Sequence, residues 1–70
     1  MKIRFLGTTS NEGNCPRAFA TDRGTFVLQG ARVTDPAVLA ELQTTYGGLP
    51  DDETVIEIPA GLLAFLPTTR

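Results

Sequence analysis

The 70-residue chain contains no histidine, no tryptophan and a single cysteine, Cys15. Without a second thiol, Cys15 cannot form a disulfide within the chain. One thiol without histidine also cannot supply the ligands of a structural zinc or iron site. A nucleophilic cysteine needs a neighbouring base or a helix N-terminus, whereas Cys15 precedes Pro16 at the start of an expected strand. We therefore expect no enzyme, metal or cofactor, and interpret Cys15 as a buried or half-buried thiol.

Long hydrophobic runs are also missing. The most hydrophobic segment, residues 58–67, has ten residues, whereas a membrane span needs about 20. The N-terminal sequence MKIRFLG does not resemble a secretory signal. Together with the unpaired cysteine, this indicates a cytoplasmic protein without a membrane segment. We expect one small domain, residues 1–70, whose core contributes only about 3–5 kcal/mol, so an additional chain would help to stabilise it.

Charge is distributed unevenly along the chain, whose formal net charge is −2. Residues 1–34 carry five basic and two acidic side chains, a balance of +3, and residues 35–70 carry one basic and six acidic side chains, a balance of −5. In the simpler interpretation, the two halves lie side by side and neutralise each other. In the other, the asymmetry marks an interaction surface.

The apolar pattern predicts several short strands. Ile3 and Phe5 alternate with basic residues, so we expect them to face inward. Residues 17–21 and 25–29 form the arms of a predicted hairpin, in which Gly24 supplies the left-handed residue of a three-residue turn. Residues 31–33 continue as a short strand, and the TVIEI segment, residues 54–58, forms another. If the TVIEI strand pairs with the N-terminal one, Lys2 or Arg4 would lie across from Glu57.

Two helices complete the prediction. Asp35 and Pro36 are suited to the N-cap and first position of a helix that ends at Gly47-Gly48. A short C-terminal helix begins after Pro59 and contains several leucines. The fold class is therefore α+β: a small antiparallel sheet of three to five short strands, with one central helix and a short C-terminal helix laid over it.

The sequence also does not match the motifs of phosphate-binding loops, calcium loops or nucleic-acid-binding surfaces. The loop from Gly7 to Gly13 has five intervening residues and lacks the lysine of a phosphate-binding loop. The acidic run Asp51-Asp52-Glu53 lacks the spacing of a calcium loop, and we interpret it as a solvated turn that can serve as a docking patch. Five basic residues in the N-terminal half are a small electrostatic footprint, so direct nucleic-acid binding is only a distant alternative.

The sequence SNEGNCPRAFATDRGTFVLQG, followed by an apolar strand that leads into IPAGLLAFL, resembles a group of small actinobacterial domains of unknown function. The BldB-type proteins belong to this group. Over residues 8–33 and 54–66 the resemblance includes a polar loop ending in Asn-Cys and two strands about a glycine turn. Several such proteins are encoded beside helix-turn-helix regulators, so the resemblance implies a protein that acts with such a regulator.

Two functions follow as expectations. The first is a non-enzymatic accessory protein that binds a helix-turn-helix regulator and modulates it. Its partner-binding residues are the acids Glu41, Asp51, Asp52, Glu53 and Glu57. The second is a structural homodimer with no regulator. Its subunits are joined through the alternate strand faces that carry Leu6, Val27 and Val55.

Overall fold

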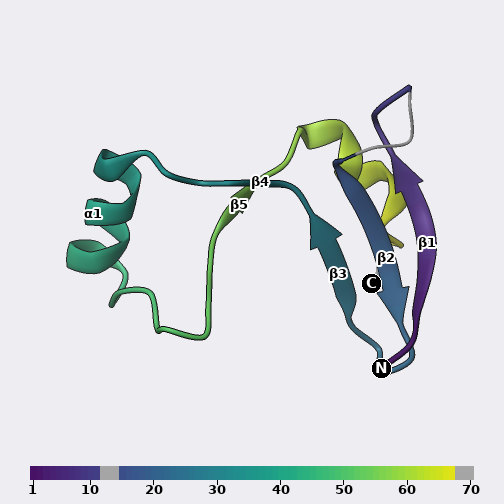
Figure 1. Ribbon diagram of the computed structural model, residues 1–70, viewed down its shortest axis with the longest axis horizontal. Helices are drawn as coiled ribbons and strands as arrows, with labels where there is room; N and C mark the ends of the chain where they lie inside the picture. The colour runs from purple at the N-terminus through teal and green to yellow at the C-terminus, as the bar shows by residue number, and fades with distance from the viewer. Residues whose placement is uncertain (12–14, 68–70) are drawn as a thin grey trace.

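A computed structural model describes residues 1–11 and 15–67 and confirms the α+β fold class (Figure 1). Its two sheets are antiparallel, the first with three strands and the second with two. One α-helix and one 3-10 helix accompany them. In chain order the elements are β1 (Ile3–Thr8), β2 (Arg17–Thr21), β3 (Phe26–Gln29), β4 (Ala31–Arg32), α1 (Pro36–Thr45), β5 (Ile56–Glu57) and η1 (Ala60–Phe65).

The predicted hairpin is present as β2 and β3, the second and third strands of a sheet with the order β1-β2-β3. Gly24 has a φ of 78° and supplies the left-handed residue of the turn. The amide of Thr21 donates to the carbonyl of Thr25 at 2.9 Å. Asp22 connects this turn to the start of the chain, because its amide donates to the carbonyl of Lys2 and its carboxylate accepts from the amide of Lys2.

One face of this sheet is covered by η1. Gly7 pairs with Ala18, and Ala18 pairs with Leu28, so these positions share that face. A Cβ atom on Gly7 would lie only 2.2 Å from the Phe65 ring, which shows how closely η1 approaches β1. In the described part of the chain, Ala18 and Leu62 are the fully buried apolar residues. The core therefore lies between η1 and the first two strands, and it is small.

The chain then leaves the sheet through a two-stranded ribbon formed by β4 and β5. At the far end of this ribbon lies α1 (Figure 1). The helix begins as predicted: the Asp35 carboxylate accepts from the amide of Ala37 at 2.9 Å, and Pro36 is the first helical residue. It ends before Gly47 and Gly48, whose φ values of 89° and 97° favour glycine.

Three expectations about packing are wrong. The central helix does not lie over the three-stranded sheet; α1 buries none of its residues and is separated from that sheet by the ribbon (Figure 1). The N-terminal strand does not pair with the TVIEI segment, because β1 pairs with β2 and β5 pairs with β4. Cys15 is exposed rather than buried. For the helix and the strand, the local pattern was compatible with several neighbours, and the long-range pairing selected another one.

Candidate interaction surfaces

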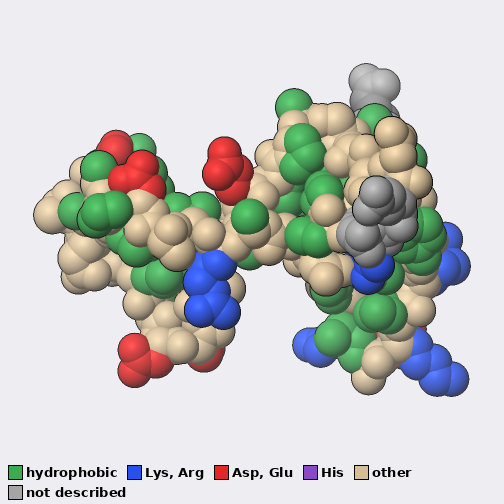
Figure 2. Space-filling view, turned by 45° about the horizontal axis from the view of Figure 1, so that its top comes forward, with side chains coloured by type: hydrophobic (Ala, Val, Ile, Leu, Met, Phe, Trp, Pro, Cys, Tyr) green, Lys and Arg blue, Asp and Glu red, His purple; other side chains and the backbone are tan. Residues whose placement is uncertain are grey.

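The molecule consists of two parts that differ in charge. We call β1–β3 with η1 the sheet lobe, and residues 33–55, which include α1, the helix lobe. Figure 2 shows most basic side chains around the sheet lobe and acidic ones around the helix lobe and the ribbon, with a basic side chain beside the helix lobe as well. The basic residues in or next to the sheet are Lys2, Arg4, Arg17 and Arg23. Apart from Asp22 in the sheet lobe and Arg32 on the ribbon, the basic and acidic side chains of the described residues lie in different parts of the molecule, which corrects the simpler interpretation of the charge pattern.

All five predicted partner-binding acids are exposed. Glu41 lies on α1, Glu57 on β5, and the consecutive residues 51–53 form a turn between them in the chain. The amide of Glu53 donates to the carbonyl of Pro50 at 3.0 Å, so this turn has a defined backbone. The structure thus places four of the five acids on the helix lobe and the fifth on the ribbon.

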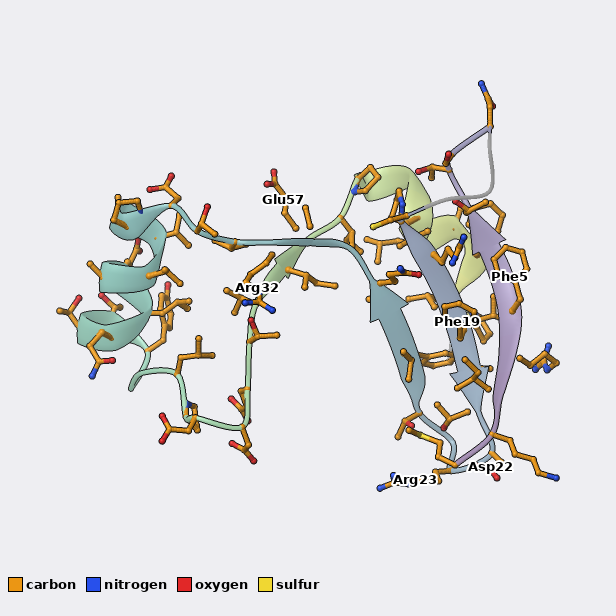
Figure 3. The ribbon with its side chains drawn as sticks, in the orientation of Figure 1. Phe5, Phe19, Asp22, Arg23, Arg32 and Glu57 are labelled. Atoms are coloured by element: carbon orange, nitrogen blue, oxygen red, sulfur yellow. The ribbon has the colours of Figure 1, made fainter. Side chains whose placement is uncertain are left out.

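Glu57 does not face the basic side chain nearest to it in the ribbon. Arg32 pairs across the ribbon with Ile56, whereas Glu57 pairs with Ala31, so Arg32 and Glu57 belong to opposite faces. Figure 3 shows the two side chains pointing to opposite sides. The carboxylate of Glu57 is therefore presented to solvent.

The three residues predicted for a dimer face are not on one surface. Val27 lies in β3, whereas Val55 lies at the edge of the helix lobe next to the ribbon, where its carbonyl accepts from the amide of Val33. Leu6 is half-buried at the irregularity of β1 between Phe5 and Gly7. This shift of register moves Leu6 out of the simple alternation from which its facing was predicted.

A different apolar surface is present, and the sequence analysis missed it. Phe5 pairs with Phe19, and Phe19 pairs with Val27, so the three share the sheet face opposite Gly7 and Ala18. Ile3 extends the same face. We call these four residues the open face. Ile3 and Phe5 are 54% and 55% exposed, although both were expected to face inward. The rings of Phe5 and Phe19 meet edge to face, with centroids 5.8 Å apart (Figure 3).

A second apolar surface lies on α1. Val38, Leu39 and Leu42, with Tyr46 at the C-cap, recur at helical spacing. We call these four residues the helix stripe. Leu39 and Leu42 are half-buried, whereas Val38 is 43% and Tyr46 is 69% exposed. The spacing of the stripe was visible in the sequence, but only the structure shows that Leu39 and Leu42 are half-buried while Val38 and Tyr46 remain exposed.

Other features offer little for a small ligand. A surface depression next to the hairpin turn, lined by Lys2, Arg4 and Asp22 among others, has a volume of about 170 Å³, below the roughly 300 Å³ at which ligand pockets begin. Among residues 1–11 and 15–67, no cluster of three metal-ligating side chains is found. In the same part of the chain, no helix has the length and apolar character needed to cross a membrane.

Comparison with family models, with curated proteins and with solved structures finds no match to this chain.

Proposed function

We propose that this chain is a non-enzymatic accessory protein that binds a helix-turn-helix regulator through its acidic residues and modulates it. One observation carries the proposal: the acids Glu41, Asp51, Asp52, Glu53 and Glu57 are exposed on the helix lobe and ribbon, away from the basic sheet lobe. This surface projects away from the basic residues of the sheet lobe, and Arg32 on the ribbon points to the side opposite Glu57.

The negative charge of these acids indicates a partner with a basic surface. A DNA-binding protein presents lysine and arginine side chains where it contacts phosphates. Acids that occupy those positions would compete with DNA, which is a direct way to modulate a regulator. Complementary charge of this kind chiefly raises the association rate and selects the partner. This electrostatic attraction extends over about 8 Å at physiological ionic strength.

The turn at residues 51–53 provides the sharpest test. We expect the combined substitutions Asp51→Ser, Asp52→Ser and Glu53→Ser to weaken binding to a purified helix-turn-helix regulator of the native host. They should also flatten the dependence of the affinity on salt, because three attractive charges are removed. Titration calorimetry or fluorescence anisotropy at several salt concentrations measures both effects. An operator duplex for the regulator should displace the wild-type chain.

The matched control removes three charges from the other lobe. Lys2→Gln, Arg4→Gln and Arg23→Gln together change the net charge by the same amount in the opposite direction and should leave the complex at least as strong. Equal affinities for the wild type and the turn variant would reject the docking role of the turn. A stable ternary complex with operator DNA would show that the acids do not occupy the DNA-binding surface.

A further inference from the structure

The isolated chain exposes more surface than a compact protein of its size. A compact monomer of 7.5 kDa exposes about 4,250 Å², whereas this chain exposes 5566 Å², an excess of roughly 1,300 Å². The radius of gyration is 13.9 Å, against about 11 Å for a compact chain of 70 residues. A stable interface buries about 800 Å² on each partner, so the excess is large enough to supply one.

The helix lobe contributes to this large exposed surface. α1 has ten residues and buries none of them. Isolated helices of fewer than about 12–15 residues are marginal in water, and most helices depend on packing of an apolar face. The helix stripe is the apolar face available for such packing, and Val38 and Tyr46 in it remain largely exposed. A further surface that covers the stripe would stabilise the helix.

The sheet lobe also has an apolar surface that remains partly exposed. Its open face carries two phenylalanine rings, and η1 lies on the opposite side of the sheet. Half-exposed aromatic residues side by side on a sheet are a typical interaction surface. The sheet lobe is also basic, whereas the helix lobe is acidic (Figure 2). The two unpaired apolar surfaces therefore belong to lobes of opposite charge.

We propose that two copies of this chain form a reciprocal dimer in which the helix stripe of each copy packs on the open face of the other. The occupant of each open face is thus a second copy. The ribbon holds α1 away from its own sheet (Figure 1), which leaves both surfaces accessible to the partner. A two-fold arrangement uses both matched pairs at once and is closed, which is the commonest form of oligomer. The inference goes beyond the proposed function and requires no regulator.

Cross-linking tests the pairing of surfaces directly. In a Cys15→Ser background, the variants Phe5→Cys and Val38→Cys each carry a single thiol, one on the open face and one on the helix stripe. We expect an equimolar mixture of the two to form a disulfide-linked dimer under mild oxidation, and each variant alone to form little. Cross-linking of Phe5→Cys with itself would indicate a sheet-to-sheet contact and overturn the proposal. Efficient cross-linking of Val38→Cys with itself would indicate a helix-to-helix contact and overturn it as well.

Sedimentation of unmodified protein provides the second measurement. The wild type should sediment as a dimer at micromolar concentration. The pair Ile3→Thr and Phe5→Thr, or the pair Val38→Gln and Tyr46→Gln, should raise the dimer dissociation constant roughly a hundredfold, because each substituted pair occurs twice in the dimer. A mixture of the two defective variants should recover part of the affinity, since one of its two interfaces contains only wild-type side chains.

Ala40→Gln is the matched control, because Ala40 is exposed and lies on the side of α1 away from the helix stripe. This variant should dimerise like the wild type, and circular dichroism should show that all variants keep their secondary structure. A wild-type chain that remains monomeric at 100 μM would overturn the proposal. So would a monomer whose open face binds a labelled oligothymidine, because nucleic acid would then be the occupant.

Discussion

At the scale of single residues, the approach of Phe65 to Gly7 determines how η1 lies on the sheet. A Cβ atom at position 7 would be 2.2–2.6 Å from three atoms of the Phe65 ring, well inside any permitted contact. The ring belongs to η1 and is 40% exposed, so a side chain at position 7 would have to push it away from β1. The space available therefore favours glycine at this position, although its φ is not in the left-handed region.

We expect Gly7→Ala to lower the free energy of unfolding by about 1–3 kcal/mol, as overpacking does in other cores. Urea denaturation followed by circular dichroism measures the change. Gly61→Ala is the matched control: its Cβ would meet Thr9 at an ordinary 3.5 Å. The control should be neutral or slightly stabilising, because alanine restricts the unfolded chain. Equal stabilities of the wild type and Gly7→Ala would contradict the described packing of η1.

Single residues also show which structural features a local sequence pattern can predict. Gly24, Asp35 and Pro36 were assigned correctly, because turn and cap geometry depends on the few residues around each position. Ile3 and Phe5 were assigned to a buried face and are about half exposed. Alternation tells which side chains share a face of a strand, but it does not tell whether another element covers that face.

At the scale of elements, α1 is formed by its own capping residues and receives little from the rest of the chain. The Asp35 carboxylate accepts from the amide of Ala37, and the amides of Tyr46 and Gly48 donate to the carbonyl of Leu42 at the other end. No residue of the helix is buried. The helix should consequently be the element whose stability depends most on local interactions.

We expect Asp35→Ala to lower the free energy of opening of α1 by about 1 kcal/mol, since the N-cap acceptor is lost. Amide hydrogen exchange resolves this, because α1 amides report its local opening while β2 amides report unfolding of the sheet. Asp35→Asn keeps a side-chain oxygen at the same place and should behave like the wild type. A uniform loss of protection in α1 and β2 would show instead that the helix and sheet open together.

At the scale of the whole molecule, the described core is too small for the surface around it. Ala18 and Leu62 are the fully buried apolar residues of the described part, and the surface exceeds that of a compact monomer. The stability of such a chain is expected to depend on the contacts it makes with other chains. The reciprocal dimer and the acidic docking surface are two separate proposals for those contacts, and their tests use different side chains.

For an obligate dimer, stability increases with protein concentration by mass action. We therefore expect the thermal midpoint of the wild type to rise measurably when the concentration is raised from about 1 to 100 μM. Differential scanning calorimetry over this concentration range measures the midpoint. The pair Ile3→Thr and Phe5→Thr should show a lower midpoint with a weaker dependence on concentration. A midpoint that does not change with concentration would show that the chain folds as a monomer and would contradict the reciprocal dimer.

Local physical chemistry allowed the sequence by itself to determine the hairpin, its glycine turn, the start and end of α1 and the α+β class. Each depends on hydrogen bonds and backbone angles within a few residues. The acidic surface was also visible, since charges must lie near solvent wherever the chain places them. Only the tertiary structure decided that β5 pairs with β4, that the charged halves lie in separate lobes, and that Ile3, Phe5, Phe19 and Val27 form an open face. These outcomes depend on which strands pair across long sequence separations, and several pairings satisfy the same local pattern.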